Sequence, residues 1–353
     1  MIEVKNISVK LGDFSLQNVS FAANNGDYLA LLGVSGAGKS VILEIISGLL
    51  KPQMGKILLD GTDVTSSKIQ ERKVGVVYQD LSLFPHLSVF ENIAYPLRIR
   101  KKAKMEIKAQ VGNFAALAGV SHLLNRNPNT LSGGEAKRVA IARTLASGAK
   151  VLLLDEPLSN LDVSHKSELR GLLRDINRTG ITIIHVTHDF TEATTLANKV
   201  AIIENGRLIQ FGTPEEVFRH PKTEFVARFS GMKNIYRANQ ITKADNSGLK
   251  KAIINESISI HFLSEANPKS GFVMVSEEHV LISAKHLESS ALNQFKGRVK
   301  EVYFALSGME LVVDIGVELV ASISQSSQQA LEIAPNRDLW VSFKASSVKF
   351  VEA

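Results

Sequence analysis

The residues of this sequence that are best suited to chemistry begin with a glycine-rich octapeptide. Its residues match the phosphate-loop pattern G-x-x-x-x-G-K-[ST] and are Gly33, Val34, Ser35, Gly36, Ala37, Gly38, Lys39 and Ser40. Such a loop points backbone amides at phosphate oxygens, while Lys39 can reach the β- and γ-phosphates and Ser40 can ligate Mg²⁺. We predict a nucleoside triphosphate site here; a glycine-rich turn that merely starts a helix is the weaker alternative.

Two carboxylates follow a second apolar run. Residues 151–154 are Val-Leu-Leu-Leu, and Asp155 and Glu156 come directly after them. Buried carboxylates are costly unless they are paired or bind a metal. Asp155 is therefore suited to hold Mg²⁺, and Glu156 is suited to activate an attacking water as a general base.

Two further polar side chains follow predicted strands. Gln79 comes after the run 74–78, and His188 comes after the run 182–187. Polar groups at the carboxyl ends of strands can reach a bound nucleotide, so Gln79 is a candidate for Mg²⁺ and water positioning and His188 for the γ-phosphate. Taken alone, Gln79 is better interpreted as an exposed loop amide and His188 as an ordinary surface or core histidine.

A second glycine-rich stretch, residues 131–138, starts a predicted helix and is called the signature segment below. Ser132 is the predicted N-cap, and Glu135 completes a capping box. A well-made helix start does not explain Gly133 and Gly134, which cost stability within a first turn. Their free amides predict a second phosphate-binding position.

The elements that must position these residues follow from the hydrophobic pattern. Residues 28–32 predict a buried strand before the phosphate loop, and residues 41–47 predict the start of a helix after it. Further strands are predicted at 2–9, 19–23 and 55–59, and helix over 88–122. After Gly231 the pattern changes to short strands, at 253–262, 272–276, 295–303, 311–315, 319–323 and 339–343. These predict a small β-barrel or sandwich.

Composition narrows the class of protein. The chain has 353 residues, of which 44% are hydrophobic and 22% are charged, and it contains no cysteine. No apolar run approaches the roughly 18 residues of a membrane span, and no secretory signal starts the chain, so a cytoplasmic protein is expected. The net charge of +6 is dispersed apart from Arg98 to Lys104, which argues against nucleic acid as a partner.

The order of these motifs resembles that of ATP-binding cassette proteins over residues 1–230. The resemblance rests on the phosphate loop, Gln79, the signature segment, residues 151–156, residues 159–162 and His188. It implies an α/β cassette with a RecA-like core, an antiparallel β subdomain and a helical subdomain. It also implies an ATPase that uses ATP and Mg²⁺ and forms a head-to-tail dimer, in which the signature of one chain meets the ATP of the other and Asp162 links the two sites.

The sequence departs from the family pattern at a few positions. Residues 135–137 are Glu-Ala-Lys where the family often has glutamines, and Asn160 replaces a common alanine. Leu11 stands where an aromatic side chain usually stacks on adenine, and Phe14 is the candidate substitute.

Residues 231–353 resemble the β-barrel accessory domains of import ATPases. Residues 293–299 and 343–348 are similar to molybdate-binding barrel repeats. Lys344, Ser346 and Ser347 of the second stretch are candidate oxyanion ligands, together with Ser290, which precedes the first stretch. Leu292 stands where that motif usually has arginine. A polar edge strand is the alternative interpretation.

The whole chain thus resembles the ATPase subunit of molybdate or tungstate importers. The resemblance implies a separate membrane permease, an extracytoplasmic oxyanion-binding protein as an indirect partner, a position at the cytoplasmic face of the membrane, and feedback inhibition by the oxyanion. The apolar segment 83–95 is expected to receive the permease. An importer of sulfate, iron, polyamine or sugar is the main alternative. A soluble cassette protein acting on nucleic acid is less expected, because such proteins usually join two cassettes in one chain.

Overall fold

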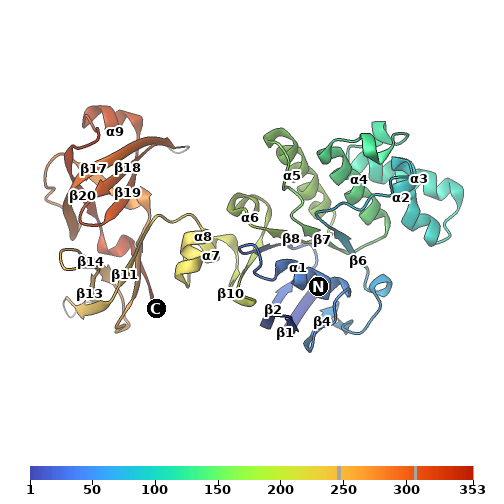
Figure 1. Cartoon of the computed structure of the whole chain (residues 1–353), viewed down its shortest axis with the longest axis horizontal. Helices are drawn as coiled ribbons and strands as arrows, with labels where there is room; N and C mark the ends of the chain where they lie inside the picture. The colour runs from blue at the N-terminus through green and yellow to red at the C-terminus, as the bar shows by residue number, and fades with distance from the viewer. Residues whose placement is uncertain (245–247, 306–307, 353) are drawn as a thin grey trace. The chain divides into compact units, whose positions relative to one another are not determined.

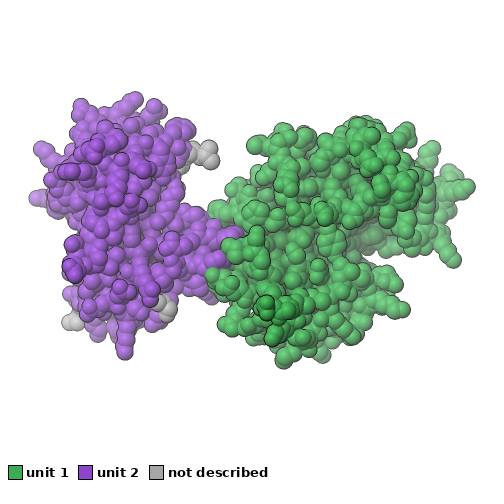
Figure 2. Space-filling model, in the orientation of Figure 1, with its two compact units in different colours: residues 1–217 green, residues 218–353 purple. Residues whose placement is uncertain are grey.

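A computed structural model describes residues 1–244, 248–305 and 308–352 of the chain. The chain forms two compact units, Met1–Val217 and Phe218–Ala353 (Figure 2). Helix α8 (Glu224–Phe229) packs its Ala227 with Ile235 and Met274 of the second unit. The division between the two compact units therefore lies before α8. The domain boundary predicted from the sequence, at residue 230, lies after α8 and stays a prediction.

The first unit is organised around a six-stranded sheet with the order β10-β9-β3-β8-β7-β6. All neighbours are parallel except β9 and β10. Strands β3 and β8 are buried along their whole length, as expected for strands covered on both faces. The bounds are β3 (Tyr28–Leu32), β6 (Val74–Val77), β7 (Val151–Asp155), β8 (Thr182–Thr187), β9 (Lys199–Glu204) and β10 (Arg207–Gly212).

A second, antiparallel sheet covers one side of this core. Its order is β2-β1-β4-β5, and its strands are β1 (Ile2–Leu11), β2 (Phe14–Ala23), β4 (Met54–Leu59) and β5 (Thr62–Asp63). Apolar side chains of β1 and β2 form one core with helix α1 (Lys39–Ser47) and with residues such as Leu29 and Leu153 of the parallel sheet. In Figure 1, α1 lies between the two sheets.

Helices cover the other side of the parallel sheet. They are α2 (Val89–Ile99), α3 (Lys104–Leu117), α4 (Gly133–Ala146), α5 (Val163–Arg178) and α6 (Phe190–Leu196), and the first four share a core with Leu152 and Leu154 of β7 (Figure 1). The helical prediction for 88–122 is resolved into α2, α3 and a 3₁₀ turn (Ser121–Leu123). No helix in the described ranges is long and apolar enough to span a membrane.

Short connections complete the first unit and lead to the second. They comprise 3₁₀ turns at Ile69–Glu71 and Pro128–Thr130 and the helix α7 (Pro214–Arg219), which contains the division between the units.

The second unit is mainly β-structure around one core. Its three sheets have the orders β11-β15-β21, β12-β13-β14 and β16-β20-β17-β18-β19, and residues such as Phe262, Val273 and Val341 pack together across them. The strands are β11 (Asn234–Ala238), β12 (Gln240–Lys243), β13 (Leu249–Ile253), β14 (Ser259–Leu263), β15 (Gly271–Val275), β16 (Leu281–Ser283), β17 (Asn293–Ala305), β18 (Gly308–Asp314), β19 (Glu318–Ile323), β20 (Asp338–Phe343) and β21 (Val348–Glu352). Helix α9 (Gln325–Ala330) and 3₁₀ turns at Glu277–His279 and Ala345–Ser347 connect them.

The predicted single strand 253–262 is wrong. The structure has a hairpin there, with β13 ending at Ile253 and β14 starting at Ser259. Asn255 makes the turn, because its Oδ1 accepts hydrogen bonds from the amides of Ser257 (2.9 Å) and Ile258 (2.7 Å). An asparagine that binds the backbone two residues on stabilises a turn, and it interrupts an otherwise strand-like pattern.

Candidate nucleotide-binding site

The phosphate loop connects β3 to α1, and two of its glycines, Gly33 and Gly38, lie close to neighbouring backbone and side-chain atoms. Gly38 precedes α1 with φ 104°. A Cβ atom at Gly38 would lie 2.5 Å from Phe14 Cζ and 2.7 Å from Leu16 Cδ2, and one at Gly33 would lie 2.3 Å from Ile203 O. Only glycine fits these positions without a shift of the neighbours. The loop is therefore packed against Phe14, Leu16 and Ile203, and a loop of this kind at a helix start can direct amides at a bound phosphate.

Lys39 is buried at the start of α1. Its Nζ atom donates to Gly33 O (2.8 Å) and Val34 O (2.9 Å), so the ammonium group closes over the loop that contains it. Burial lowers the pKa of Lys39, and the carboxylates of Glu156 and Asp155 oppose that shift. An ammonium held by two carbonyls can exchange them for phosphate oxygens.

Ser40 and Asp155 bring two oxygen ligands together. Ser40 Oγ donates to Asp155 Oδ1 over 3.3 Å, between the first turn of α1 and the end of β7. Burial raises the pKa of Asp155, while the hydrogen bond from Ser40 partly offsets this effect. A hydroxyl and a carboxylate at the phosphate loop are the hard ligands that Mg²⁺ uses in proteins, so these residues fit the cation predicted from the sequence.

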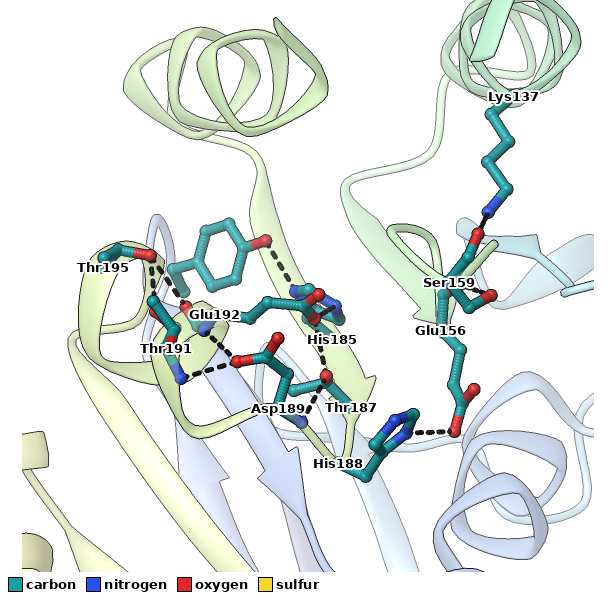
Figure 3. A network of polar contacts seen from close by, with 11 residues as sticks. Lys137, Glu156, Ser159, His185, Thr187, His188, Asp189, Thr191, Glu192 and Thr195 are labelled. Carbon is teal, nitrogen blue, oxygen red and sulfur yellow. Dashed lines mark hydrogen bonds and ion pairs between the residues drawn. The ribbon is translucent and has the colours of Figure 1, made fainter. Parts of the chain in front are cut away.

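Glu156 and His188 lie at the ends of neighbouring strands. His188 Nδ1 lies 3.0 Å from Glu156 Oε1 (Figure 3). Glu156 has a positive φ of 46°, and its amide donates to Val186 O of β8. Gln79 lies at the same edge of the sheet. Val77 pairs with Leu154, so Gln79 and Glu156 each lie two residues beyond that pair, and Gln79 is exposed. The structure therefore places all three predicted residues at one edge of the parallel sheet and brings the side chains of Glu156 and His188 into contact.

The signature segment has the predicted capping box. Ser132 Oγ accepts from the Glu135 amide (3.3 Å), and Glu135 Oε2 accepts from the Ser132 amide (2.7 Å). Ser132 and Gly133 are exposed, which leaves the start of α4 open to a ligand. Gly134 is buried, and a Cβ atom there would lie 3.3 Å from His165 Cδ2.

Asp162 caps α5 beside the signature segment. Its carboxylate accepts from the His165 amide (2.9 Å) and from Ser164 Oγ (2.7 Å), and His165 Nδ1 lies 2.7 Å away. These hydrogen bonds hold the pKa of Asp162 well below its ordinary value. Asp162 thus positions the imidazole of His165 that packs on Gly134.

The candidate base-stacking residues differ in their packing. Leu11 is 38% exposed, whereas Phe14 packs on the core beneath the loop and close to Gly38. Phe14 is thereby engaged by the protein itself, and its use for adenine stacking stays a hypothesis.

The candidate oxyanion residues lie around one pair of strands in the second unit. Ser290 precedes β17 and Lys344 follows β20, and the two strands are joined by the Asn293–Phe343 pair. Ser290, Lys344 and Ser346 are exposed, and Ser347 is half-buried in the 3₁₀ turn. Their use as oxyanion ligands stays a prediction.

Sequence reasoning missed two sets of buried polar residues next to the nucleotide site. Lys137 lies on α4, and Tyr28, His185 and Glu192 lie on β3, β8 and α6; all four are less than 10% exposed. The sequence contains a signal that could have identified Lys137, because a lysine among the apolar positions of a predicted helix is unusual. The other three come from distant parts of the chain and had none.

Comparison with known proteins identifies the families that this chain resembles. Residues 16–159 match the model of the ABC transporter family, and residues 289–350 match the TOBE domain model. The molybdate/tungstate import ATP-binding protein of Pyrococcus abyssi is 38% identical over 99% of each chain, and that of Pyrococcus horikoshii is 40% identical, also over 99% of each chain. A dimeric ATP-binding cassette solved in a post-hydrolysis state with ADP and Pi is 29% identical, with a TM-score of 0.55, and covers 61% of this chain and 99% of its own.

The fold, the site and the full-length similarity agree. This chain belongs to the ABC transporter ATP-binding proteins, with a C-terminal TOBE domain.

Proposed function

We propose that this protein is the ATP-hydrolysing subunit of an ABC importer for molybdate or tungstate. The observation that carries the ATPase assignment is the grouping of Lys39, Ser40, Asp155, Glu156 and His188 around the phosphate loop. The substrate assignment is supported by full-length similarity to import proteins whose names specify molybdate and tungstate.

Each group has a role that its position supports. The loop amides and Lys39 bind the phosphates of ATP, and Ser40, Asp155 and Gln79 would hold Mg²⁺. The cation supplies charge neutralisation at the phosphates. Glu156 accepts a proton from the attacking water, and His188 orients that carboxylate and contacts the γ-phosphate. Hydrolysis that persists unchanged after loss of the Glu156 carboxylate would exclude this assignment.

The second partner of each ATP is a second copy of this chain. Ser132 and Gly133 are exposed at the start of α4, with the buried Gly134 directly after them, and a symmetric head-to-tail dimer would bring this helix start to the partner's nucleotide. The solved cassette bound to ADP and Pi is itself dimeric.

The permease is proposed to bind at a hollow between the parallel sheet and α2. The hollow has a volume of about 470 Å³ and is lined by the half-buried Phe84 and by the exposed Tyr95 and Ile99. Phe84 packs against Tyr95 with 4.6 Å between the ring centroids and 47° between the ring planes, and Arg143 Cζ lies 5.1 Å from the centroid of the Phe84 ring. This aromatic and apolar surface is suited to bind an amphipathic helix of the permease. Bound there, the protein would act at the cytoplasmic face of the membrane, and an extracytoplasmic oxyanion-binding protein would be an indirect partner.

Phe84→Asp tests this surface in a reconstituted complex. Basal ATP hydrolysis should persist, while stimulation by the permease and transport should be lost. Leu263→Asp is the control, because it places the same charge on an exposed apolar residue of the second unit, away from the hollow. Equal coupling in both variants would exclude the surface.

The second unit is proposed to bind the imported oxyanion and to inhibit transport. Calorimetric titration of the intact dimer with molybdate, tungstate and sulfate tests the substrate. We expect selective binding of molybdate or tungstate that is weakened in Lys344→Ala. Absence of binding would discard feedback control at this site and remove this support for the substrate, without affecting the ATPase assignment.

A further inference from the structure

A buried lysine connects the signature helix to the turn that carries Glu156. Lys137 of α4 is 7% exposed, and its Nζ atom donates to Ser159 O over 2.5 Å. Ser159 Oγ in turn donates to Glu156 O over 2.7 Å (Figure 3). A continuous path of hydrogen bonds therefore joins α4 to the backbone of Glu156.

This path includes two features that destabilise the fold, a buried ammonium group and a residue with positive φ. Burial disfavours the charged form and lowers the pKa of Lys137, while the carboxylates of Glu192 and Glu156 oppose the shift. Glu156 is also strained, since a non-glycine residue with positive φ costs on the order of 1–3 kcal/mol. Such a conformation persists only where several contacts impose it. The bond from Ser159 Oγ to Glu156 O is one of those contacts, and the charge-assisted bond from Lys137 holds Ser159 in place.

We propose that Lys137 is a positioning residue that couples the signature helix to Glu156. Ligand contact at Ser132–Gly134 acts on the start of α4, and Lys137 lies one turn further along the same helix. A shift of α4 is then transmitted through Ser159 to the turn of Glu156. This proposal rests on the proposed ATPase function.

Kinetics of the full-length protein test the coupling. Lys137→Met keeps the length of the side chain but removes the donor, and we expect kcat to fall about 10- to 100-fold while KM for ATP changes less than about twofold. Lys137→Gln keeps a neutral donor and should recover part of kcat. Lys104→Met is the control, because Lys104 is exposed on α3 and lies outside the site.

The outcomes separate the two levels of the proposal. An unchanged kcat in Lys137→Met, or the same loss in Lys137→Gln as in Lys137→Met, overturns the coupling. If Lys137→Met does not fold, Ser159→Ala decides, since it removes the hydroxyl bond to Glu156 O and should lower kcat without changing KM. Absence of ATP hydrolysis by the wild type would instead refute the proposed function.

A second network of hydrogen bonds holds Thr187 and Asp189, the two neighbours of His188. The His188 side chain is 59% exposed, so packing does not hold it in place. The residues on either side of it, Thr187 and Asp189, are held by hydrogen bonds instead. The Asp189 amide donates to Thr187 Oγ1 (3.0 Å), and Thr187 Oγ1 donates to Glu192 Oε2 (2.5 Å) (Figure 3). Asp189 Oδ1 caps α6 through the amides of Thr191 and Glu192.

The network ends at the strand that enters the phosphate loop. Glu192 is 4% exposed, and its Oε2 atom lies 3.3 Å from His185 Nε2. His185 Nδ1 lies 2.9 Å from the hydroxyl of Tyr28, the first residue of β3. Burial opposes ionisation of Glu192, but the contacts with His185 and Thr187 hold its pKa below the ordinary value. The buried carboxylate is thus a stable anchor for Thr187.

We infer that Thr187 and Glu192 are positioning residues that aim His188 at Glu156. Thr187→Val preserves the β-branched shape in the strand but removes the hydroxyl that both donates and accepts. We expect kcat to fall about 10- to 100-fold, with KM for ATP within about twofold of the wild type. Thr187→Ser restores the hydroxyl and should restore kcat.

Control variants separate positioning from folding. Thr195→Ala removes a hydroxyl from the exposed Thr195 of α6, the helix that carries Glu192. That hydroxyl bonds only to main-chain carbonyls in the described structure, so the variant should leave kcat unchanged. Equal losses in Thr187→Ser and Thr187→Val, or an unchanged kcat in Thr187→Val, overturn the inference. If Thr187→Val does not fold, Glu192→Ala against Glu192→Gln gives the same comparison, because glutamine keeps an acceptor for Thr187.

Discussion

The imidazole of His188 lies 3.0 Å from the carboxylate of Glu156, and the two residues come from adjacent parallel strands. The register of these strands makes the contact possible. Asp155 pairs with Val186, so Glu156 lies one residue beyond the ladder and His188 lies two. The positive φ of Glu156 turns its side chain where an extended strand would not direct it. Strand register and one strained residue therefore create the pair.

Glu156→Gln should bind ATP and lose turnover. Glutamine has the size of glutamate and cannot accept a proton from water at neutral pH, and general base catalysis contributes about 10²- to 10⁴-fold. We expect kcat to fall by about that factor, with ATP affinity preserved. Phosphate release and binding of a fluorescent ATP analogue measure the two effects, and rapid turnover by the variant would assign the base to another residue.

Gly38→Ala should destabilise the phosphate loop more than Gly36→Ala. Both glycines have positive φ, 104° and 79°, so both substitutions carry a backbone cost of about 1–2 kcal/mol. A Cβ atom at Gly38 would also collide with Phe14 and Leu16, whereas one at Gly36 meets no atom within 4 Å. Collision adds about 1–3 kcal/mol. Urea unfolding of the two variants isolates the collision, and equal midpoints would contradict it.

Lys39→Met should weaken ATP binding. The substitution keeps the apolar stem and removes the ammonium group that lies over the loop. A charge-assisted hydrogen bond contributes about 1.5–3 kcal/mol, which corresponds to a loss of affinity of about 10- to 100-fold. Titration with an ATP analogue checks this value. Lys104→Met is the exposed control, and a similar affinity in both variants would count against a phosphate contact by Lys39.

Asp155→Asn should stabilise the nucleotide-free protein at neutral pH. Burial raises the pKa of Asp155 above its ordinary value of 3.8, so the folded state binds this proton more tightly than the unfolded state does. The contribution of this group to stability therefore falls as the pH rises from 3.8 through the folded pKa. The asparagine variant lacks that fall, and its Tm should exceed that of the wild type at pH 7.

The order should reverse when Mg²⁺ and ATP are added. The wild type gains stability by binding the cation, and the variant, which lacks the charged ligand, should gain less. Thermal unfolding at pH 4 and pH 7, with and without Mg²⁺ and ATP, measures both effects. A variant that is less stable than the wild type at pH 7 without ligand would contradict the assigned cost of burial.

The local elements of the site were predictable from the sequence because neighbours along the chain encode them. The strand 28–32, the capping box at Ser132 and the strand 182–187 are present as predicted. Each depends on an apolar run or on a side chain that bonds to the backbone within three residues. The hairpin at Asn255 was missed although its cause is also local, because apolar residues on both sides masked the turn.

Only the tertiary structure decided which distant residues meet. No spacing in the sequence connects Lys137 with Ser159, or Tyr28 with His185 and Glu192, since these contacts depend on how helices pack on a parallel sheet. The sequence by itself determined the chemical groups and the elements that carry them, because periodicity and capping are local. Strand order and register then placed those groups, because hydrogen-bonded ladders join segments that lie far apart in the chain.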